Sequence, residues 1–300
     1  MKTMEIRNLP LDALVDLTSE RLDTIYSGYL DDTPSLELKN AMEYSLLNGG
    51  KRLRPLLIYA TGTVFNAPLE SLDIAAAAVE LIHTYSLIHD DLPCMDNAAM
   101  RRGRPACHKA FGEGMAVLAG DALHTFAMQI LASHPAPLKP ERRLQMMSIL
   151  SNACGPFGMA AGQALDLTVM TDDSISTRVL EDIYRLKTGA LLTACIEMGW
   201  LASKNDDEAN QKAMRDFGRH IGLAFQIQDD IFDMEATSSE LGKPVDNDSH
   251  KFTYPKMHGI NVAKQKVETL YEQALQAINY LGDDAQLLRE LAKMMLKRKR

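Results

Sequence analysis

The segment FGRHIGLAFQIQDDIFDM, residues 217–234, decides the fold class. Its apolar residues recur with helical spacing and cover most sides of the predicted helix, as in helices at the centre of a bundle. Asp229 and Asp233 share one face with Gln226 and Asp230. Like charges one turn apart repel, and burying an unpaired carboxylate costs free energy. The stripe therefore indicates a bound cation, although a solvated acidic face at a helix end would also explain it.

Helical periodicity continues outward from this segment. Residues 74–88 place Ile74, Ala78, Leu81 and Tyr85 on one apolar face, and residues 267–281 repeat the pattern. Alternating β-branched runs are scarce, and the turn signals between helices are short. We therefore expect one all-α domain over residues 1–300, with about ten helices.

Another acidic cluster, residues 90–96 (DDLPCMD), is the first in chain order and closes the helix predicted over 74–89. Asp90 and Asp96 are six residues apart, so a regular helix would separate them by about 240°. Pro93 cannot continue the hydrogen-bond ladder, and the chain can loop to return Asp96 beside Asp90. Carboxylate oxygens suit Mg²⁺, which commonly takes one or two carboxylates plus substrate phosphates. Taken alone, an acidic loop that ends a helix is the alternative.

Basic residues lie near glycine at several points. Residues 49–55 read GGKRLRP, and Arg101-Arg102-Gly103 follows the first acidic cluster. Lys and Arg on flexible backbone suit phosphate oxygens. Gly189, after Lys187-Thr188, should weaken its helix and could aim backbone carbonyls at a ligand.

Composition limits the other classes. There are 32 Lys and Arg against 40 Asp and Glu, a net charge of −8, which does not favour nucleic-acid binding. The four cysteines form no Cys-x-x-Cys pair, so we expect neither a zinc site nor a disulfide framework, and a cytoplasmic location. No run reaches the roughly 20 apolar residues of a membrane span, so we expect no stable membrane insertion.

The motifs, taken in order, resemble those of the bacterial farnesyl diphosphate synthases of the trans-prenyltransferase family, from about residue 40 to the C-terminus. The motifs that carry this resemblance are GGKRLRP at 49–55, AAAVELIHTYSLIHDDLPCMD at 76–96, RRGRP at 101–105, LAGDAL at 118–123, GQALDL at 162–167, KTGAL at 187–191, FQIQDDIFD at 225–233, LGK at 241–243 and TYP at 253–255.

The resemblance implies a role for each matching residue. Mg²⁺, three ions per site, would bridge the allylic diphosphate to Asp90, Asp91, Asp96, Asp229 and Asp233. The same diphosphate would be held by Arg101, Lys187 and Lys243, and that of isopentenyl diphosphate by Lys51, Arg54, His83 and Arg102. Thr188 and Gln226 would face the reacting carbons, Lys251 would close over the site, and Tyr85 would limit product length.

The resemblance also implies the fold and the reaction. The family fold is an all-α bundle around a deep central cavity, and family members are usually homodimers. The expected reaction condenses isopentenyl diphosphate with dimethylallyl or geranyl diphosphate to give farnesyl diphosphate. The sequence departs from the family where acidic residues usually follow the first cluster, at Asn97, Ala98 and Ala99. The loop between Lys243 and Lys251 also looks about two residues short.

Several alternatives stay open. The same chemistry could give a C10 or C20 product. A non-catalytic subunit of a heteromeric synthase tends to lose one aspartate cluster, and both are present here. A class I terpene cyclase would not need Lys51 and Arg54. The Glu80-x-x-His83 motif occurs in di-iron bundles, but the chain holds no second copy.

Overall fold

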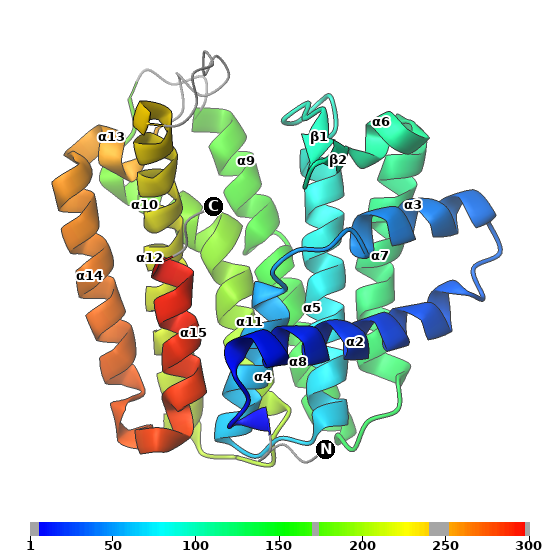
Figure 1. Ribbon diagram of the computed structural model, residues 1–300, viewed down its shortest axis with the longest axis horizontal. Coiled ribbons are helices and arrows are strands. Elements are labelled where there is room, and N and C mark those ends of the chain that lie inside the picture. The colour runs from blue at the N-terminus through cyan, green and yellow to red at the C-terminus, as the bar shows by residue number, and fades with distance from the viewer. Residues whose placement is uncertain (1–5, 170–173, 240–251, 298–300) are drawn as a thin grey trace. The chain divides into compact units, whose positions relative to one another are not determined.

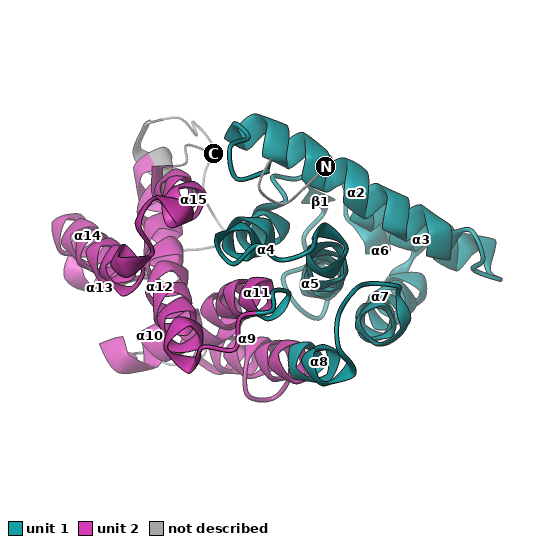
Figure 2. Ribbon diagram, turned by 90° about the horizontal axis from the view of Figure 1, so that it is seen from below, with its two compact units in different colours: residues 1–147, 201–204 teal, residues 148–200, 205–300 magenta. Residues whose placement is uncertain are grey.

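The computed structural model describes residues 6–169, 174–239 and 252–297 (Figure 1). The described chain is almost entirely helical, which confirms the all-α class. It divides into two compact units, residues 1–147 with 201–204 and residues 148–200 with 205–300, coloured teal and magenta in Figure 2. The single-domain expectation is not tested by this division and stays a prediction.

Unit 1 is built around α5, against which α2, α3, α4 and α7 pack. Its elements are α2 (Leu11–Leu30), α3 (Leu36–Leu46), α4 (Leu53–Val64), α5 (Leu69–Asp90), β1 (Met100–Arg101), β2 (Arg104–Pro105), α6 (Cys107–Phe111) and α7 (Glu113–Ser133), and α8 (Pro140–Cys154) runs from this unit into unit 2.

Helix α5 is more deeply buried than the sequence indicated. We expected one apolar face over residues 74–88, but nearly every residue from Ser71 to Ile82 is buried, including Glu80. The run of four alanines at 75–78 explains this, because small side chains let neighbouring helices approach on several sides. Helix α5 ends at Asp90, as the position of Pro93 predicted.

Unit 2 is built around α12, which packs against α14, α13, α10 and a π-helical turn, η1. The elements of unit 2 are α9 (Met159–Val169), α10 (Thr177–Tyr184), η1 (Arg185–Gly189), α11 (Ala190–Leu201), α12 (Glu208–Ser239), α13 (Tyr254–His258), α14 (Ile260–Ala277), the 3₁₀ helix η2 (Asn279–Ala285) and α15 (Gln286–Lys297). The predicted helix 217–234 lies within α12 and is confirmed.

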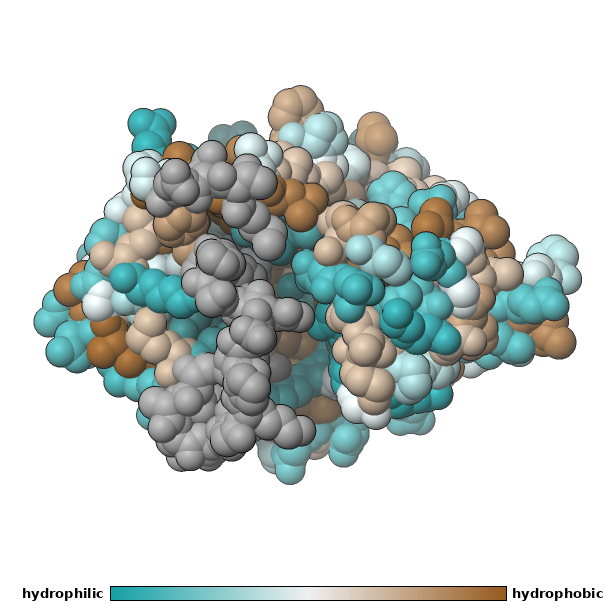
Figure 3. Space-filling view, turned by 90° about the horizontal axis from the view of Figure 1, so that it is seen from above, coloured by the Kyte–Doolittle hydropathy of each residue, from teal (hydrophilic) through white to brown (hydrophobic). Residues whose placement is uncertain are grey.

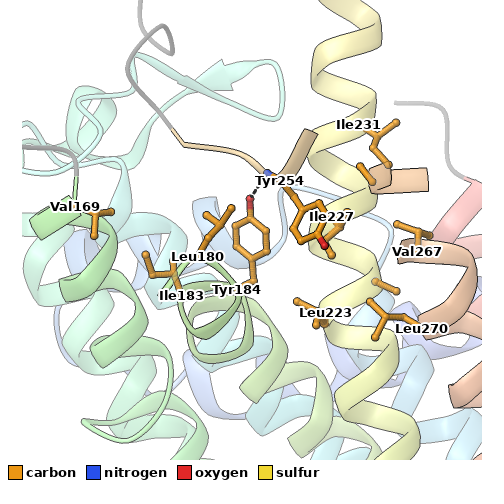
Figure 4. Packing of buried hydrophobic residues seen from close by; sticks show 12 residues of the cluster. Val169, Leu180, Ile183, Tyr184, Leu223, Ile227, Ile231, Tyr254, Val267 and Leu270 are labelled. Atoms are coloured by element: carbon orange, nitrogen blue, oxygen red, sulfur yellow. Dashed lines mark hydrogen bonds between the residues drawn. The ribbon is translucent and has the colours of Figure 1, made fainter. Parts of the chain in front are cut away.

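The core of unit 2 gathers apolar side chains from α9, α10, α12, α13 and α14 (Figure 4). Leu223, Ile227 and Ile231 supply one face of α12 to this core at helical spacing. The aspartate stripe lies on an adjacent side of α12, and its member Asp230 is buried beside the core residue Tyr184. Burial of the apolar face thus fixes the rotation of α12, and with it the direction of its carboxylates.

Two described helices, α5 and α7, are long and apolar enough to cross a membrane by length and composition, contrary to the prediction that no run of the chain is. The most apolar window of α5 is 78% buried inside the protein, as in the core helix of a globular fold. The corresponding window of α7 is 44% buried, and one or two such helices are weak evidence for a membrane span.

Candidate functional site

The first aspartate cluster forms a tight loop after α5. The backbone N–H of Asp96 donates to the carbonyl of Asp90 at 2.9 Å, and that of Asn97 donates to the carbonyl of Leu92 at 3.0 Å. Asn97 adopts a positive φ of 48°, which closes the turn. The predicted return of Asp96 to Asp90 is thus confirmed. Asp90 is half-buried and Asp96 is exposed, so both lie within reach of solvent.

The middle residue of this cluster, Asp91, has a different environment. Its carboxylate is buried and accepts hydrogen bonds from Arg101, whose Nε lies 3.1 Å from both oxygens. The hydrogen bonds with Asp91 raise the pKa of Arg101. The β1–β2 hairpin presents Arg101, since β1 ends at this residue. Asp91 therefore shares its oxygens with a guanidinium, and its role as a metal ligand stays a prediction.

The neighbouring Arg102 joins the double-glycine segment. Its Nη1 donates to the carbonyl of Gly49 at 2.5 Å. Gly50 has a φ of 118°, which favours glycine, and a Cβ there would lie 2.8 Å from Cζ of Arg102, so a side chain would displace this guanidinium. Arg102 and Arg104 of the hairpin are exposed, and Figure 3 shows hydrophilic and apolar areas side by side on this face of the molecule. The two basic motifs at 49–55 and 101–105 are thus brought together within unit 1.

The three cations of the basic motif at residues 49–55 differ in their environments. Arg52 is buried, donates to Glu80 at 2.7 Å and to the carbonyl of Leu46 at 2.9 Å, and so ties α5 to the end of α3. Lys51 is exposed and Arg54 is half-buried. Arg52 is therefore a structural residue, and its ion pair occupies the glutamate on which the di-iron alternative depends.

His83 lies near the cations expected to bind isopentenyl diphosphate. Loss of hydration, followed by the positive charges of Arg54 and Arg102, lowers the pKa of His83 well below 6.5. This coupling places His83 close to both arginines, although they are 29 and 19 residues away in sequence. His83 is therefore neutral at physiological pH and would contact a phosphate by hydrogen bonding, without a charge.

Tyr85 precedes Asp90 on α5 and is half-buried. Its ring meets His124 of α7 edge-on at a centroid distance of 5.1 Å, and His89 at 5.7 Å. A Cβ at Gly120 would fall 2.1 Å from Nε2 of His89, so the glycine of the LAGDAL motif lets α7 approach this cluster. Tyr85 is thus held between two rings, and its role in product length stays a prediction.

In unit 2, the turn η1 brings two predicted catalytic residues together. Thr188 donates from its hydroxyl to Oε1 of Gln226 on α12 at 2.8 Å. The sequence predicts that Gly189 loosens the helix here, and the π-helical turn 185–189 confirms an irregular backbone. Such turns occur often at functional sites.

Two glycines allow η1 to be approached closely from both sides. A Cβ at Gly162 of α9 would lie 2.2 Å from the backbone nitrogen of Lys187, and one at Gly222 of α12 would lie 2.9 Å from Cα of Gly189. Lys187 in turn pairs with Asp166 of α9 at 2.6 Å. The GQALDL motif therefore supplies both the close contact and the counter-ion of Lys187.

The aspartates of α12 also differ from one another. Asp229 is half-buried and Asp233 is exposed, whereas Asp230 is buried. Asp230 accepts a hydrogen bond from the hydroxyl of Tyr184, which itself accepts one from the backbone nitrogen of Tyr254 at 3.1 Å (Figure 4). Burial and the Asp230 charge raise the pKa of Tyr184. Asp230 thus stabilises the start of α13.

Sequence reasoning missed Asp166 and Tyr184 as partners of site residues. Asp166 belongs to the GQALDL motif at 162–167, so the family resemblance could have indicated it. Tyr184 cannot be told from an ordinary core residue in the sequence. Lys243 and Lys251 lie outside the described residues. Within the described residues, no group of three or more His, Cys, Asp or Glu side chains could hold a metal ion by itself. This is compatible with Mg²⁺, which takes further oxygens from water and phosphates.

Comparison with known proteins gives a consistent result. Residues 35–291 match the model of the polyprenyl synthetase family. The chain is 47% identical over 265 residues to the farnesyl diphosphate synthase of Haemophilus influenzae, covering 87% of this chain and 89% of that protein. It is 43% identical to the farnesyl diphosphate synthase of Escherichia coli, covering 96% and 97%.

A solved structure, that of a geranyltransferase from Legionella pneumophila, superimposes with a TM-score of 0.86 at 36% identity. The match covers 96% of this chain and 98% of that one.

Proposed function

The chain belongs to the polyprenyl synthetase family, and from this membership we propose how its residues carry out the reaction. The protein is a prenyltransferase that condenses isopentenyl diphosphate with an allylic diphosphate to give farnesyl diphosphate. Dimethylallyl and geranyl diphosphate are the allylic substrates. One family model spans residues 35–291, which supports the proposal of a single synthase domain.

Isopentenyl diphosphate is assigned to the cations of unit 1. Lys51, Arg54 and Arg102 supply positive charge, and the neutral imidazole of His83 supplies a hydrogen bond. One guanidinium group can donate two parallel hydrogen bonds to two oxygens of a phosphate, so it fixes the orientation of the phosphate as well as offsetting its charge. The contact between Arg102 and Gly49 supports this assignment, because it joins the two basic motifs.

The allylic diphosphate is assigned to Mg²⁺ and to three cations, Arg101, Lys187 and Lys243. We propose that three Mg²⁺ ions are held by Asp90, Asp96 and Asp229, with Asp91 and Asp233 as further ligands. The all-oxygen donor set fits a hard cation. When bound, Mg²⁺ offsets the charge of the departing diphosphate. Prenyl synthases generally use a divalent metal, which supports this part of the proposal.

The pairing of Thr188 with Gln226 carries the catalytic assignment. The allylic carbon–oxygen bond breaks, its electron pair leaves with the diphosphate, and the resulting carbocation is faced by oxygen atoms that do not attack it. The Gln226 amide oxygen and the backbone carbonyls of Lys187 and Thr188 are suitable groups, because preorganised dipoles stabilise charge without reorganising.

The double bond of isopentenyl diphosphate then attacks the cation and forms the new carbon–carbon bond. A proton is lost from the adjacent carbon, and we assign its removal to the departed diphosphate. Lys187, Thr188 and Gln226 offer no base of the required strength at neutral pH. Lys251 is assigned to closing the site.

Product length is assigned to Tyr85, about 7.5 Å before Asp90 along α5 at 1.5 Å per residue. An aromatic ring at this position would close the cavity into which the chain grows and so stop elongation at C15. The ring contacts with His89 and His124 support this role, because they restrict the movement of Tyr85. A homodimer in the cytoplasm is proposed on family grounds.

The test is to incubate the purified protein with Mg²⁺, isopentenyl diphosphate and dimethylallyl diphosphate, and to identify the products by mass spectrometry. A C15 diphosphate that disappears when excess EDTA is added is the expected result. C10 or C20 as the end product would show another chain length. Full turnover in EDTA would reject the metal assignment, and no product at all would favour a non-catalytic subunit.

A further inference from the structure

The β1–β2 hairpin of unit 1 carries one cation for each of the two proposed diphosphate sites. Arg101, at the end of β1, is assigned to the allylic diphosphate, and Arg102, in the turn, is assigned to isopentenyl diphosphate. The hairpin stands beyond the C-terminal end of α5 (Figure 1). Whatever fixes this hairpin therefore sets the direction of both cations.

The hairpin is too short to keep its own shape. Its strands, Met100–Arg101 and Arg104–Pro105, have two residues each, and an isolated two-stranded hairpin is at best marginally stable in water. Arg102 and Gly103 form the turn with φ values of 52° and 75°. Positive φ suits a tight hairpin turn, but it is unfavourable for a residue with a side chain such as Arg102. Contacts from outside the hairpin must therefore stabilise it.

Tyr44, near the C-terminal end of α3, makes three such contacts. Its hydroxyl donates to the carbonyl of Pro105 at 2.8 Å, and Cζ of Arg104 lies over its ring, 4.1 Å from the centroid. Its ring also meets that of Phe111 on α6 edge-on, at a centroid distance of 5.2 Å. A cation over an aromatic face and an edge-to-face pair of rings are both attractive. Tyr44 thus joins α3 to strand β2 and to the helix that follows it.

Asn48, just beyond α3, adds weaker contacts to both strands. Its Nδ2 donates to the carbonyl of Arg101 at 3.5 Å, and its Oδ1 accepts from Nη1 of Arg104 at 3.4 Å, both long for hydrogen bonds. The space left between α3, α5 and the hairpin is about 20 Å³, enough for about one water molecule. The hairpin is therefore packed against α3, and Tyr44 provides the firmest of the contacts between them.

We propose that Tyr44 is a positioning residue for the two substrate-binding arginines of the hairpin. Tyr44 fixes β2, and so keeps Arg101 directed at Asp91 and Arg102 directed at the carbonyl of Gly49. Without Tyr44 the arginines would have to be ordered when the diphosphate binds, and such ordering costs affinity. The inference rests on the proposed function, because it takes Arg102 as a cation of the isopentenyl diphosphate site.

The test is calorimetric titration of isopentenyl diphosphate into the full-length protein in EDTA, without an allylic substrate. Tyr44→Ala should weaken binding about fivefold, which is part of the roughly tenfold or more that one charge-assisted phosphate contact contributes. Tyr44→Leu fills much of the same space, which guards against a variant that does not fold, and should weaken binding as Tyr44→Ala does. Tyr44→Phe keeps the ring under Arg104 and should bind within about twofold of the wild type.

Tyr29→Ala is the matched control. Tyr29 of α2 is half-buried, as Tyr44 is, and it also has an edge-on ring contact, with Phe126 at 5.1 Å, and a hydrogen bond, with His134 at 3.1 Å. These partners lie away from the hairpin. Tyr29→Ala should therefore lower the melting temperature about as much as Tyr44→Ala does and leave the affinity for isopentenyl diphosphate unchanged. A merely structural role of Tyr44 would make the two alanine variants bind alike.

A double-mutant cycle separates this inference from the proposed function. Arg102→Ala should weaken binding roughly tenfold or more, and the double variant with Tyr44→Ala should bind no more weakly than Arg102→Ala alone. The inference is overturned if Arg102→Ala weakens binding while Tyr44→Ala and Tyr44→Leu do not, if Tyr29→Ala weakens it equally, or if the two changes are additive. If the wild type does not bind, or if Arg102→Ala has no effect, the assignment of isopentenyl diphosphate to these cations is itself wrong.

Discussion

The first aspartate cluster stands where a helix ends, whereas the second stands within a helix that continues for several residues beyond it. In the loop, a backbone hydrogen bond returns Asp96 to Asp90. On α12, helical spacing alone aligns Asp229 with Asp233. The two backbones differ, yet each presents two partly or fully exposed carboxylates on either side of a buried one.

The buried aspartates show the clearest difference. Asp91 is 2% exposed and is bound by a charged partner, Arg101, while Asp230 is 8% exposed and is bound by a neutral one, Tyr184. The positive charge of a guanidinium offsets the charge of the carboxylate directly. A hydroxyl donates a hydrogen bond to the carboxylate but leaves its charge in place. The comparison teaches that an Asp-Asp pair in sequence can hold one solvent-facing residue and one structural residue.

The largest expected effect tests the solvent-facing members. Asp90→Ala and Asp229→Ala should each lower turnover at least about 100-fold, the size of effect seen when one group that stabilises leaving charge is removed. Stability should change little, because removing one of several like charges relieves repulsion. Steady-state kinetics and thermal unfolding measure the two quantities. Asp283→Ala, at an exposed position away from both clusters, is the control and should keep normal turnover. If Asp90→Ala or Asp229→Ala also kept near-normal turnover, the corresponding cluster would be a solvated acidic face.

The next largest effect concerns only the helix that precedes the first cluster, because Tyr85, the residue proposed to limit product length, lies on α5. Tyr85→Ala should shift the product from C15 to C20 or longer, since the growing chain is no longer stopped. Tyr85→Phe keeps the ring and should still release C15. Product analysis by mass spectrometry decides the matter. If the alanine variant is folded and active yet stops at C15, another side chain limits the product.

A smaller effect tests the charged partner of Asp91. Arg101→Ala leaves a buried carboxylate without its counter-ion and should lower the free energy of unfolding by about 2 kcal/mol, less than for a fully buried pair because Arg101 is 37% exposed. Urea unfolding measures this loss. Arg102→Ala, at an exposed residue, should cost about 0.5 kcal/mol or less. In a double-mutant cycle, Asp91→Asn should recover part of the loss, and simple additivity would refute the coupling.

The smallest effect tests the neutral partner of Asp230. Tyr184→Phe removes one hydrogen bond and should cost about 1 kcal/mol at neutral pH. The pKa of Tyr184 is raised in the folded state, so its contribution is fully present below the unfolded pKa of about 10 and is lost as the pH rises above it. Above pH 10 the wild type should therefore lose stability faster than Tyr184→Phe, by up to about 1.4 kcal/mol per pH unit. Parallel pH profiles would contradict this.

The sequence was informative where a residue's role follows from its near neighbours. The break after Asp90, the return of Asp96 and the irregular backbone before Gly189 depend on Pro93, helical spacing and glycine, and all are visible along the chain. The hydrogen bond between Thr188 and Gln226 was not predicted, because 38 residues separate them; the family resemblance implied only that both face the reacting carbons.

The sequence was uninformative where long-range packing decides. Lys51, Arg52 and Arg54 look alike in the motif, yet Arg52 points inward to Glu80. Asp90 and Asp91 are adjacent and identical in type, yet only Asp91 meets Arg101 in a buried position. These choices depend on which helix faces lie against each other, and single-sequence patterns do not contain that information.

The sequence by itself determined the all-α class, the two carboxylate clusters and the chemistry that they suit, because helical periodicity and charge spacing are local properties. The tertiary structure alone decided which aspartates and arginines are structural. The physical reason is that burial and ion pairing join side chains from different helices, and the free energy of a charged group depends on those neighbours rather than on its neighbours in sequence.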